Sequence, residues 1–248
     1  MSSPIVTALD AAVVEVRDQD MTLGARLRFV ADRVRELSTA YADAVDGFVE
    51  RLERVNAGAS APQVGDVMPG FMLPDHDGRM VMLDVLLLER LAVLVFNRGH
   101  WCPYCRLTMA GMAQIEMRIA PHALVAISPE RQQYTRQLRA DAGADFPFLS
   151  DVGSGYALSL DLAIWVDDAM AQLIASSGLD IPEYQGTEGW IMPVSRGGDT
   201  MASLTDTMRV DQPPSGLGAR VASCRSSTNE VSIPAPVAQA LPQRPRRF

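Results

Sequence analysis

The feature that most constrains this chain is a pair of closely spaced cysteines behind a buried strand. Residues 101–105 read Trp-Cys-Pro-Tyr-Cys and follow the apolar run at residues 91–96. A strand that ends near Cys-x-x-Cys and leads into a helix places the first thiol at the helix N-terminus. There, the free backbone N–H groups and the helix dipole favour the thiolate over the thiol. The pattern therefore predicts a thiol redox site with Cys102 and Cys105 as its candidate catalytic residues.

The cysteine pair has two other interpretations, a structural zinc site and two inert buried thiols. A structural zinc ion needs four ligands, and Cys-x-x-Cys supplies half of them. The third cysteine and the three histidines of the chain form no second close pair. Redox chemistry is therefore the leading interpretation, and we expect neither a metal nor an organic cofactor, since the chain has no Gly-rich nucleotide-binding motif.

Composition limits the cellular compartment and the classes of binding partner that are compatible with this chain. The formal net charge of −8 argues against a nucleic-acid surface. The apolar runs are too short to span a bilayer, the N-terminus does not resemble a secretory signal, and three cysteines do not make an extracellular disulfide framework. We expect a cytoplasmic protein that contacts neither membrane nor nucleic acid.

Hydrophobic periodicity divides the chain into three parts. Residues 1–62 form an N-terminal helical extension and linker, because apolar residues recur at three- and four-residue spacing from 21 to 55, as in one amphipathic helix or a helical hairpin. Residues 63–195 alternate short apolar runs with helical patterns, which predicts an α/β domain containing a strand–helix–strand unit across residues 91–127. We expect the N-terminal extension either to pack on the α/β domain or to form a homodimer contact.

The composition changes in residues 196–248. This segment holds seven arginines and four acidic residues, is rich in Pro and Ser, and has one aromatic residue, at its last position. Such a sequence buries too little surface to offset chain entropy. We expect a largely disordered tail with no further sheet strand, which leaves a sheet edge open.

Residues 64–194 resemble the peroxiredoxin-like branch of the alkyl hydroperoxide reductase/thiol-specific antioxidant family. The matching segments are residues 64–66, 71–75, 93–96, 98–99, 101–105, 126–129, 146–151 and 185–190. The resemblance implies a thioredoxin-like fold, a central mixed sheet flanked by helices. It also implies reduction of hydroperoxides, without cofactor, by thiols that an external reductant such as thioredoxin or glutaredoxin restores.

The resemblance leaves open which thiol attacks. In thioredoxin-type sites the first cysteine, here Cys102, is the nucleophile, whereas the peroxiredoxin pattern Pro-x-x-x-Thr-x-x-Cys puts Cys105 there. In that pattern Arg98 replaces the proline and Cys102 the threonine. We favour Cys102 because of its position at the helix start. Arg98 and His100 are the candidate cations that lower its pKa, and Trp101 is expected to pack beside the site.

The sequence is therefore compatible with three functions. The leading one is a peroxiredoxin-like peroxidase that uses the Cys102/Cys105 pair, and the second is a thioredoxin-type thiol-disulfide oxidoreductase acting on a disulfide substrate. The third is an inactive truncated or frame-shifted relative, suggested because the family resemblance stops near residue 194. Cys224, in the tail, is expected to take no part.

Overall fold

The structure is a computed structural model that describes residues 3–63, 66–88, 91–188, 191–193, 206–211 and 220–223, the last two segments by their backbone alone. No helix in these segments is long and apolar enough to cross a membrane.

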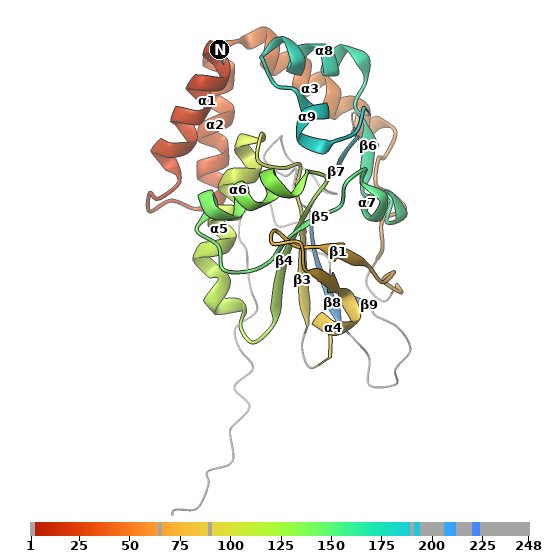
Figure 1. The fold of residues 1–248 in the computed structure, drawn as a ribbon. Coiled ribbons are helices and arrows are strands. Elements are labelled where there is room, and N and C mark those ends of the chain that lie inside the picture. Colours follow the sequence, from red (N-terminus) through yellow and green to blue (C-terminus); the bar gives the residue numbers. More distant parts are fainter. Residues whose placement is uncertain are drawn as a thin grey trace, which may run out of the picture.

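Three helices begin the chain: α1 (Pro4–Val16), α2 (Leu23–Leu37) and α3 (Thr39–Arg54). Each starts at a hydroxyl side chain, Ser3, Thr22 or Ser38, that accepts a hydrogen bond from the backbone N–H three residues later. Residues 21–55 were expected to form one amphipathic helix or a helical hairpin, and the structure shows the hairpin, α2 and α3; the sequence pattern had not singled out α1 within the helical extension. Figure 1 shows the three helices grouped at one end of the molecule, with α3 beside α8 (Asp168–Ser176).

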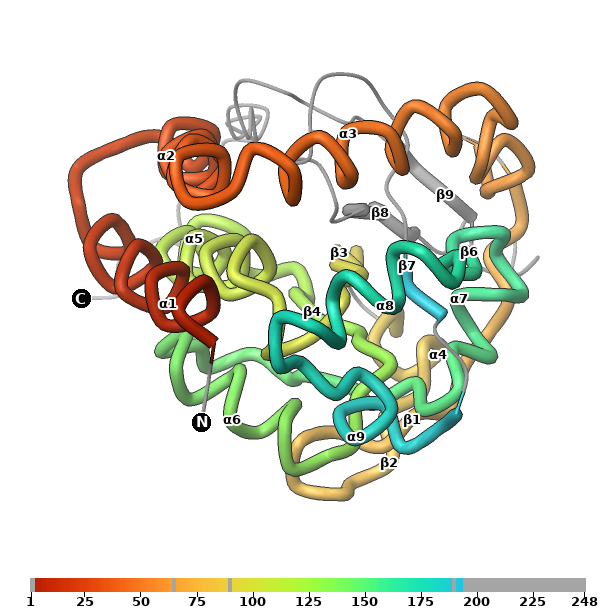
Figure 2. The backbone as a smooth tube through the Cα atoms, turned by 90° about the horizontal axis from the view of Figure 1, so that it is seen from above, coloured from red at the N-terminus to blue at the C-terminus, as the bar shows by residue number. Residues whose placement is uncertain are grey.

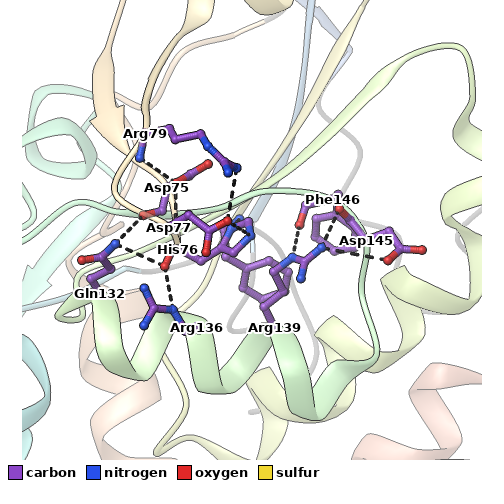
Figure 3. Close-up of polar contacts among 10 residues, drawn as sticks. Asp75, His76, Asp77, Arg79, Gln132, Arg136, Arg139, Asp145 and Phe146 are labelled. Carbon is purple, nitrogen blue, oxygen red and sulfur yellow. Dashed lines mark hydrogen bonds and ion pairs between the residues drawn. The ribbon is translucent and has the colours of Figure 1, made fainter.

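A β-hairpin follows, and its turn is fixed to a helix of the α/β domain. Strands β1 (Met72–Pro74) and β2 (Met80–Met82) pair antiparallel, as the Asp-Gly turn predicts. Asp75 Oδ1 accepts hydrogen bonds from the backbone N–H groups of Asp77 and Arg79 across the turn. On α6 (Gln132–Ala142), Gln132 and Arg136 both donate to the carbonyl of His76, as Figure 3 shows.

Within the described residues, the central sheet has five strands in the order β5-β4-β3-β8-β9. They are β3 (Ala92–Phe96), β4 (Ala123–Ser128), β5 (Phe148–Ser150), β8 (Asp206–Asp211) and β9 (Arg220–Ser223). Strands β3 and β4 are parallel, as the strand–helix–strand pattern predicts, β5 is parallel to β4, and β8 and β9 run antiparallel to their neighbours.

Strands β8 and β9 correct the prediction for residues 196–248. We expected no strand there and an open sheet edge, yet β8 pairs with all five residues of β3. The prediction was wrong because it looked for apolar side chains, whereas a strand joins a sheet through its backbone N–H and C=O groups. The other residues of the tail, Cys224 among them, lie outside the described part.

The remaining elements complete both faces of the sheet. They are α4 (Leu83–Leu86), α5 (Pro103–Ile119), α7 (Gly155–Ser159), α9 (Ile181–Gln185) and the antiparallel pair β6 (Ala163–Trp165) and β7 (Ile191–Pro193). Asp180 caps α9, and Gly186 ends it with a left-handed backbone, φ 72°, so turn-forming residues bound this short helix.

The core lies in two layers, one on each face of the sheet. On one face, Val95 and Leu124 pack against Met109 of α5 and Leu138 of α6. On the other face, residues 94, 96, 125 and 127 pack against residues from α4, α7 and the β-hairpin. Helices on both faces of this mixed sheet make the domain a thioredoxin-like fold with an N-terminal helical extension.

Candidate active site

The first thiol is the cap of the helix that follows β3. Cys102 has an extended backbone, φ −90° and ψ 115°, and its Sγ accepts a hydrogen bond from the Cys105 N–H at 3.3 Å. Pro103 occupies the first turn, where it needs no hydrogen-bond partner for its nitrogen. The predicted placement of Cys102 at a helix N-terminus is confirmed. Both thiols are free and buried, with exposed fractions of 1% and 0%.

Arg98 supplies a cation to the pair. Its Nη2 donates to Cys102 Sγ at 3.1 Å, and its backbone N–H donates to Cys105 Sγ at 3.3 Å. Trp101 holds this arginine in place: its Nε1 donates to the Arg98 carbonyl at 2.9 Å, and the guanidinium lies 5.7 Å from the centroid of its ring. The structure therefore brings Arg98 and Trp101 to the site.

The two thiols differ in acidity because the Cys105 thiol donates a hydrogen bond that stabilises the ionised form of Cys102. Burial opposes ionisation of Cys102, but the hydrogen bond from the Cys105 thiol, the Arg98 charge and the helix N–H groups outweigh it and lower the Cys102 pKa to about 6. Burial, the hydrogen bond to Cys102 and its negative charge raise the pKa of Cys105 well above its usual value. The arrangement favours Cys102 as thiolate and Cys105 as thiol.

His100 lies elsewhere. Its Nε2 is 2.8 Å from Asp141 Oδ2 on α6, and its imidazole is not among the groups that shift the Cys102 pKa. His100 contacts the site through its backbone N–H, which donates a hydrogen bond of 2.8 Å to Oε2 of the buried Glu130.

Glu130 is a residue that sequence reasoning missed. Its side chain is 0% exposed, and its Oε1 has no hydrogen-bond partner within the described residues. Burial, together with the Cys102 charge, raises its pKa to about 8 against the effect of two backbone N–H groups, which favours the neutral carboxyl at pH 7. The sequence signal that could have identified Glu130 was its position. It is an acidic residue two residues beyond β4, at the edge of the sheet where β3 also ends.

Cys102 opens into an apolar cavity of about 90 Å³. Arg98, Trp101 and Tyr104 lie on the same wall as the thiol, and the other walls come from the N-terminal helices, α8 and the β6–β7 pair. The cavity gives the buried thiol a route to a small molecule. No group of three or more potential metal ligands occurs in the part of the chain that the structure describes.

Replacing Arg98 by methionine should make Cys102 a weaker acid. The substitution keeps an unbranched chain but removes the charge, so we expect the Cys102 pKa to rise by about one to three units. At pH 6 the alkylation rate of Cys102 should then fall severalfold or more. Arg106→Met, which removes an arginine paired with Asp10 on α1, is the matched control and should leave the pKa unchanged. Equal profiles for wild type and Arg98→Met contradict the assigned role.

Comparison with known proteins places these residues in a family. Residues 64–175 match the model of the AhpC/TSA family. No curated protein sequence matches the chain.

Several solved structures are similar to the chain. Peroxidoxin BcpB from Mycobacterium tuberculosis is 21% identical, with 60% of this chain and 79% of that one covered and a TM-score of 0.46. A peroxiredoxin Q mutant from Xanthomonas campestris is 13% identical, with coverage of 62% and 79% and a TM-score of 0.44. A putative protein disulfide isomerase from Bacteroides thetaiotaomicron is 16% identical, with coverage of 68% and 82% and a TM-score of 0.41.

The matched segment contains both thiols, Arg98 and Glu130, and its strands β3, β4 and β5 form the parallel part of the sheet. The chain therefore carries an AhpC/TSA-family domain at residues 64–175.

Proposed function

We propose that the protein is a thiol-dependent peroxidase in which Cys102 is the nucleophile and Cys105 the resolving thiol. At the level of the family, the match supports thiol-dependent oxidoreductase chemistry. The observation that carries the finer assignment is the Cys102 thiolate site, a helix-capping sulfur 3.1 Å from Arg98 Nη2 on the wall of a cavity.

The chemistry takes two steps. The Cys102 thiolate attacks the terminal oxygen of a hydroperoxide, so that an S–O bond forms, the O–O bond breaks, and the leaving alkoxide or hydroxide takes up a proton. The product is a Cys102 sulfenic acid. The Cys105 sulfur then attacks Cys102 Sγ and water leaves with the Cys105 proton, which forms a Cys102–Cys105 disulfide. Two thiols are oxidised for each hydroperoxide reduced.

Arg98 and Cys105 have distinct parts in these steps. The guanidinium stabilises the thiolate before attack and faces the negative charge that develops on the leaving oxygen. The raised pKa of Cys105 keeps its thiol protonated, so it supports the thiolate by hydrogen bonding until Cys102 has been oxidised. The loss of negative charge on Cys102 then removes one cause of that raised pKa and frees Cys105 to react.

An external thiol must reduce the disulfide and restore the pair. A small thiol can reach Cys102 through the cavity. A protein reductant of the thioredoxin or glutaredoxin type needs the first turn of α5 to open, because both sulfurs are buried. The same burial argues against a protein disulfide as oxidising substrate and favours the peroxidase over the thioredoxin-type alternative.

One equivalent of hydrogen peroxide tests the proposal directly. The reduced protein should lose two thiols, and peptide mapping by mass spectrometry should find a Cys102–Cys105 disulfide. Unreacted thiols would support the inactive relative instead. A disulfide between Cys224 and either Cys102 or Cys105 would instead make Cys224 the resolving thiol.

The reactivity of Cys102 should depend on pH with a midpoint near its lowered pKa of about 6. Because the thiolate is the reactive form, the alkylation rate should be flat above pH 7 and fall tenfold per unit below the midpoint. Iodoacetamide labelling between pH 4 and 9, with the modified peptide assigned by mass, measures it. In guanidinium the midpoint should return to about 8.5. A midpoint near that value in the folded protein contradicts the site electrostatics.

A further inference from the structure

The segments that follow β3 and β4 meet at one edge of the central sheet. The two strands are parallel, their last paired residues are Phe96 and Ile127, and Figure 2 shows the strands side by side near the middle of the molecule. Gly99 and Glu130 each stand three residues beyond that pair. The loop that leads to the thiols therefore lies against the segment that carries the buried carboxyl.

Glu130 belongs to a segment that is held by three elements. It lies between the buried Ser128, the last residue of β4, and Arg131, the N-cap of α6. The backbone N–H of Arg131 donates to the carbonyl of Tyr184 on α9 at 2.9 Å. The backbone of Glu130 is therefore fixed independently of the thiol loop.

The Glu130 carboxyl contacts the backbone of residues 99–101. Its Oε2 accepts the His100 N–H at 2.8 Å, and the Trp101 N–H also acts on the carboxyl. An added Cβ at Gly99 would overlap the carboxyl, so the glycine allows the loop to approach this closely. The bonds of the carboxyl within the described residues are those to the loop, since its Oε1 has no hydrogen-bond partner there.

The same loop carries the groups that contact Cys102. Trp101 Nε1 donates to the Arg98 carbonyl, and Arg98 Nη2 donates to Cys102 Sγ at 3.1 Å. The Cys102 N–H donates to the Gly99 carbonyl at 3.2 Å, which ties the start of α5 to the loop. A shift of residues 99–101 would therefore change the contact between the cation and the thiolate.

We propose that Glu130 is a positioning residue of the thiol site, which binds the backbone N–H groups of the loop and thereby holds Arg98 against Cys102 Sγ. Its hydrogen bonds within the described residues reach neither thiol nor the Arg98 guanidinium, so it acts through the loop. The inference rests on the proposed peroxidase for its purpose. Its measured quantity is the acidity of Cys102, which requires no hydroperoxide.

The charge state of Glu130 separates positioning from direct electrostatics. Burial, together with the Cys102 charge, raises the Glu130 pKa to about 8, which favours the neutral carboxyl near pH 6, where Cys102 titrates. The charge of Glu130 acts in turn on the hydroxyl of Tyr184, whose pKa burial raises. Replacing Glu130 by a neutral side chain therefore removes no charge at pH 6, and a change in Cys102 acidity has to pass through the loop.

Two substitutions of similar size test the hydrogen bonds separately from the packing. Glu130→Gln keeps an oxygen that can accept the His100 N–H, whereas Glu130→Met keeps an unbranched side chain without this acceptor. The loop N–H groups then lose their partner, and the loop moves to find another. In iodoacetamide labelling against pH, Glu130→Met should raise the Cys102 pKa by about one unit or more. Glu130→Gln should restore the wild-type value.

Asp151→Leu is the control for the loss of a buried carboxyl. Asp151 is 5% exposed and accepts two backbone N–H groups at the start of α7. Its replacement should lower the stability of the fold but leave the Cys102 pKa unchanged. An equal rise of the Cys102 pKa in Asp151→Leu and Glu130→Met would show general loosening of the fold and overturn the positioning role.

The double variant Arg98→Met/Glu130→Met tests whether Glu130 acts through the arginine. Residues that act in one network have non-additive effects. Because the guanidinium is already absent, the double variant should have the same Cys102 pKa as Arg98→Met alone. A further rise as large as the one that Glu130→Met causes in the wild type contradicts action through Arg98.

The outcomes also separate this inference from the proposed function. An unchanged Cys102 pKa in Glu130→Met, or an equal rise in Glu130→Met and Glu130→Gln, overturns the positioning role and leaves the peroxidase standing. If the wild type does not react with hydrogen peroxide, the peroxidase is wrong, and the labelling results still decide the role of Glu130.

Amide hydrogen exchange keeps the inference testable should Glu130→Met fail to fold. In the wild type, NMR should find the His100 and Trp101 amides protected from exchange, and Glu130→Gln should retain that protection. Exchange of both amides at the rate of an unfolded chain would show that the carboxyl does not hold the loop.

Discussion

A Cys102→Ser variant should lose all reaction with hydroperoxide. Serine keeps the helix cap, because its hydroxyl can accept the Cys105 N–H bond that Cys102 Sγ accepts. It does not ionise near neutral pH and so provides no nucleophile, and Cys105 does not replace it because burial, the largest cause of the raised pKa of that thiol, remains in the variant. Peroxide consumption in the presence of excess dithiothreitol should fall to the rate without protein.

The matched variant Cys105→Ser separates attack from resolution. It keeps the nucleophile, so one equivalent of peroxide should still be consumed and a Cys102 sulfenic acid should accumulate, which dimedone labels and mass spectrometry locates. If Cys102→Ser instead retained the peroxide reaction and Cys105→Ser lost it, the roles would be exchanged, as in the peroxiredoxin pattern.

Gly99→Ala should destabilise the fold strongly. Gly99 has φ +118°, which side chains rarely adopt, and an added Cβ would overlap the carboxyl group of Glu130. Backbone strain and overpacking together should cost about 2–6 kcal/mol. Urea unfolding followed by fluorescence measures the change in the free energy of unfolding.

Gly143→Ala is the control for backbone strain alone. Its φ is +66°, and nothing lies within 4 Å of an added Cβ, so the expected cost is about 1–2 kcal/mol. Glu130→Ala in the Gly99→Ala background should recover part of the loss by removing the clashing carboxyl. Equal costs at the two glycines, or no recovery, contradict the close packing of Glu130 under the Arg98 loop.

The sequence predicted those features that depend on local pattern. Apolar runs identified β3 and β4, and the position of Cys102 between a strand and a helix predicted its role as a cap. Arg98 was found because it stands four residues before the thiol it contacts. His100 stands closer in sequence, but its side chain lies against Asp141, an interaction with a distant helix that spacing does not reveal.

Features that depend on tertiary contacts were missed. Glu130 reaches the site from a loop thirty residues beyond His100, and only the folded chain shows that its carboxyl lies under the backbone of residues 99–101. The cavity likewise joins α3 and α8, which are far apart in the sequence. Strands β8 and β9 were missed for a different reason, since they join the sheet through backbone groups that composition does not report.

The pairing of β3 with β8 has a consequence for how the protein folds. Ala92 pairs with Val210, so the pairing of the central strand β3 is completed by a residue 118 positions further along the chain. Contacts between residues so far apart in sequence form slowly, because the entropy cost of closing the loop must be met before the strand pairing stabilises the fold. A nascent chain that has not yet reached residue 206 presents one edge of β3 unpaired, next to the loop that carries Cys102. Chaperone dependence during synthesis, and aggregation when synthesis outpaces closure of the sheet, follow from this topology.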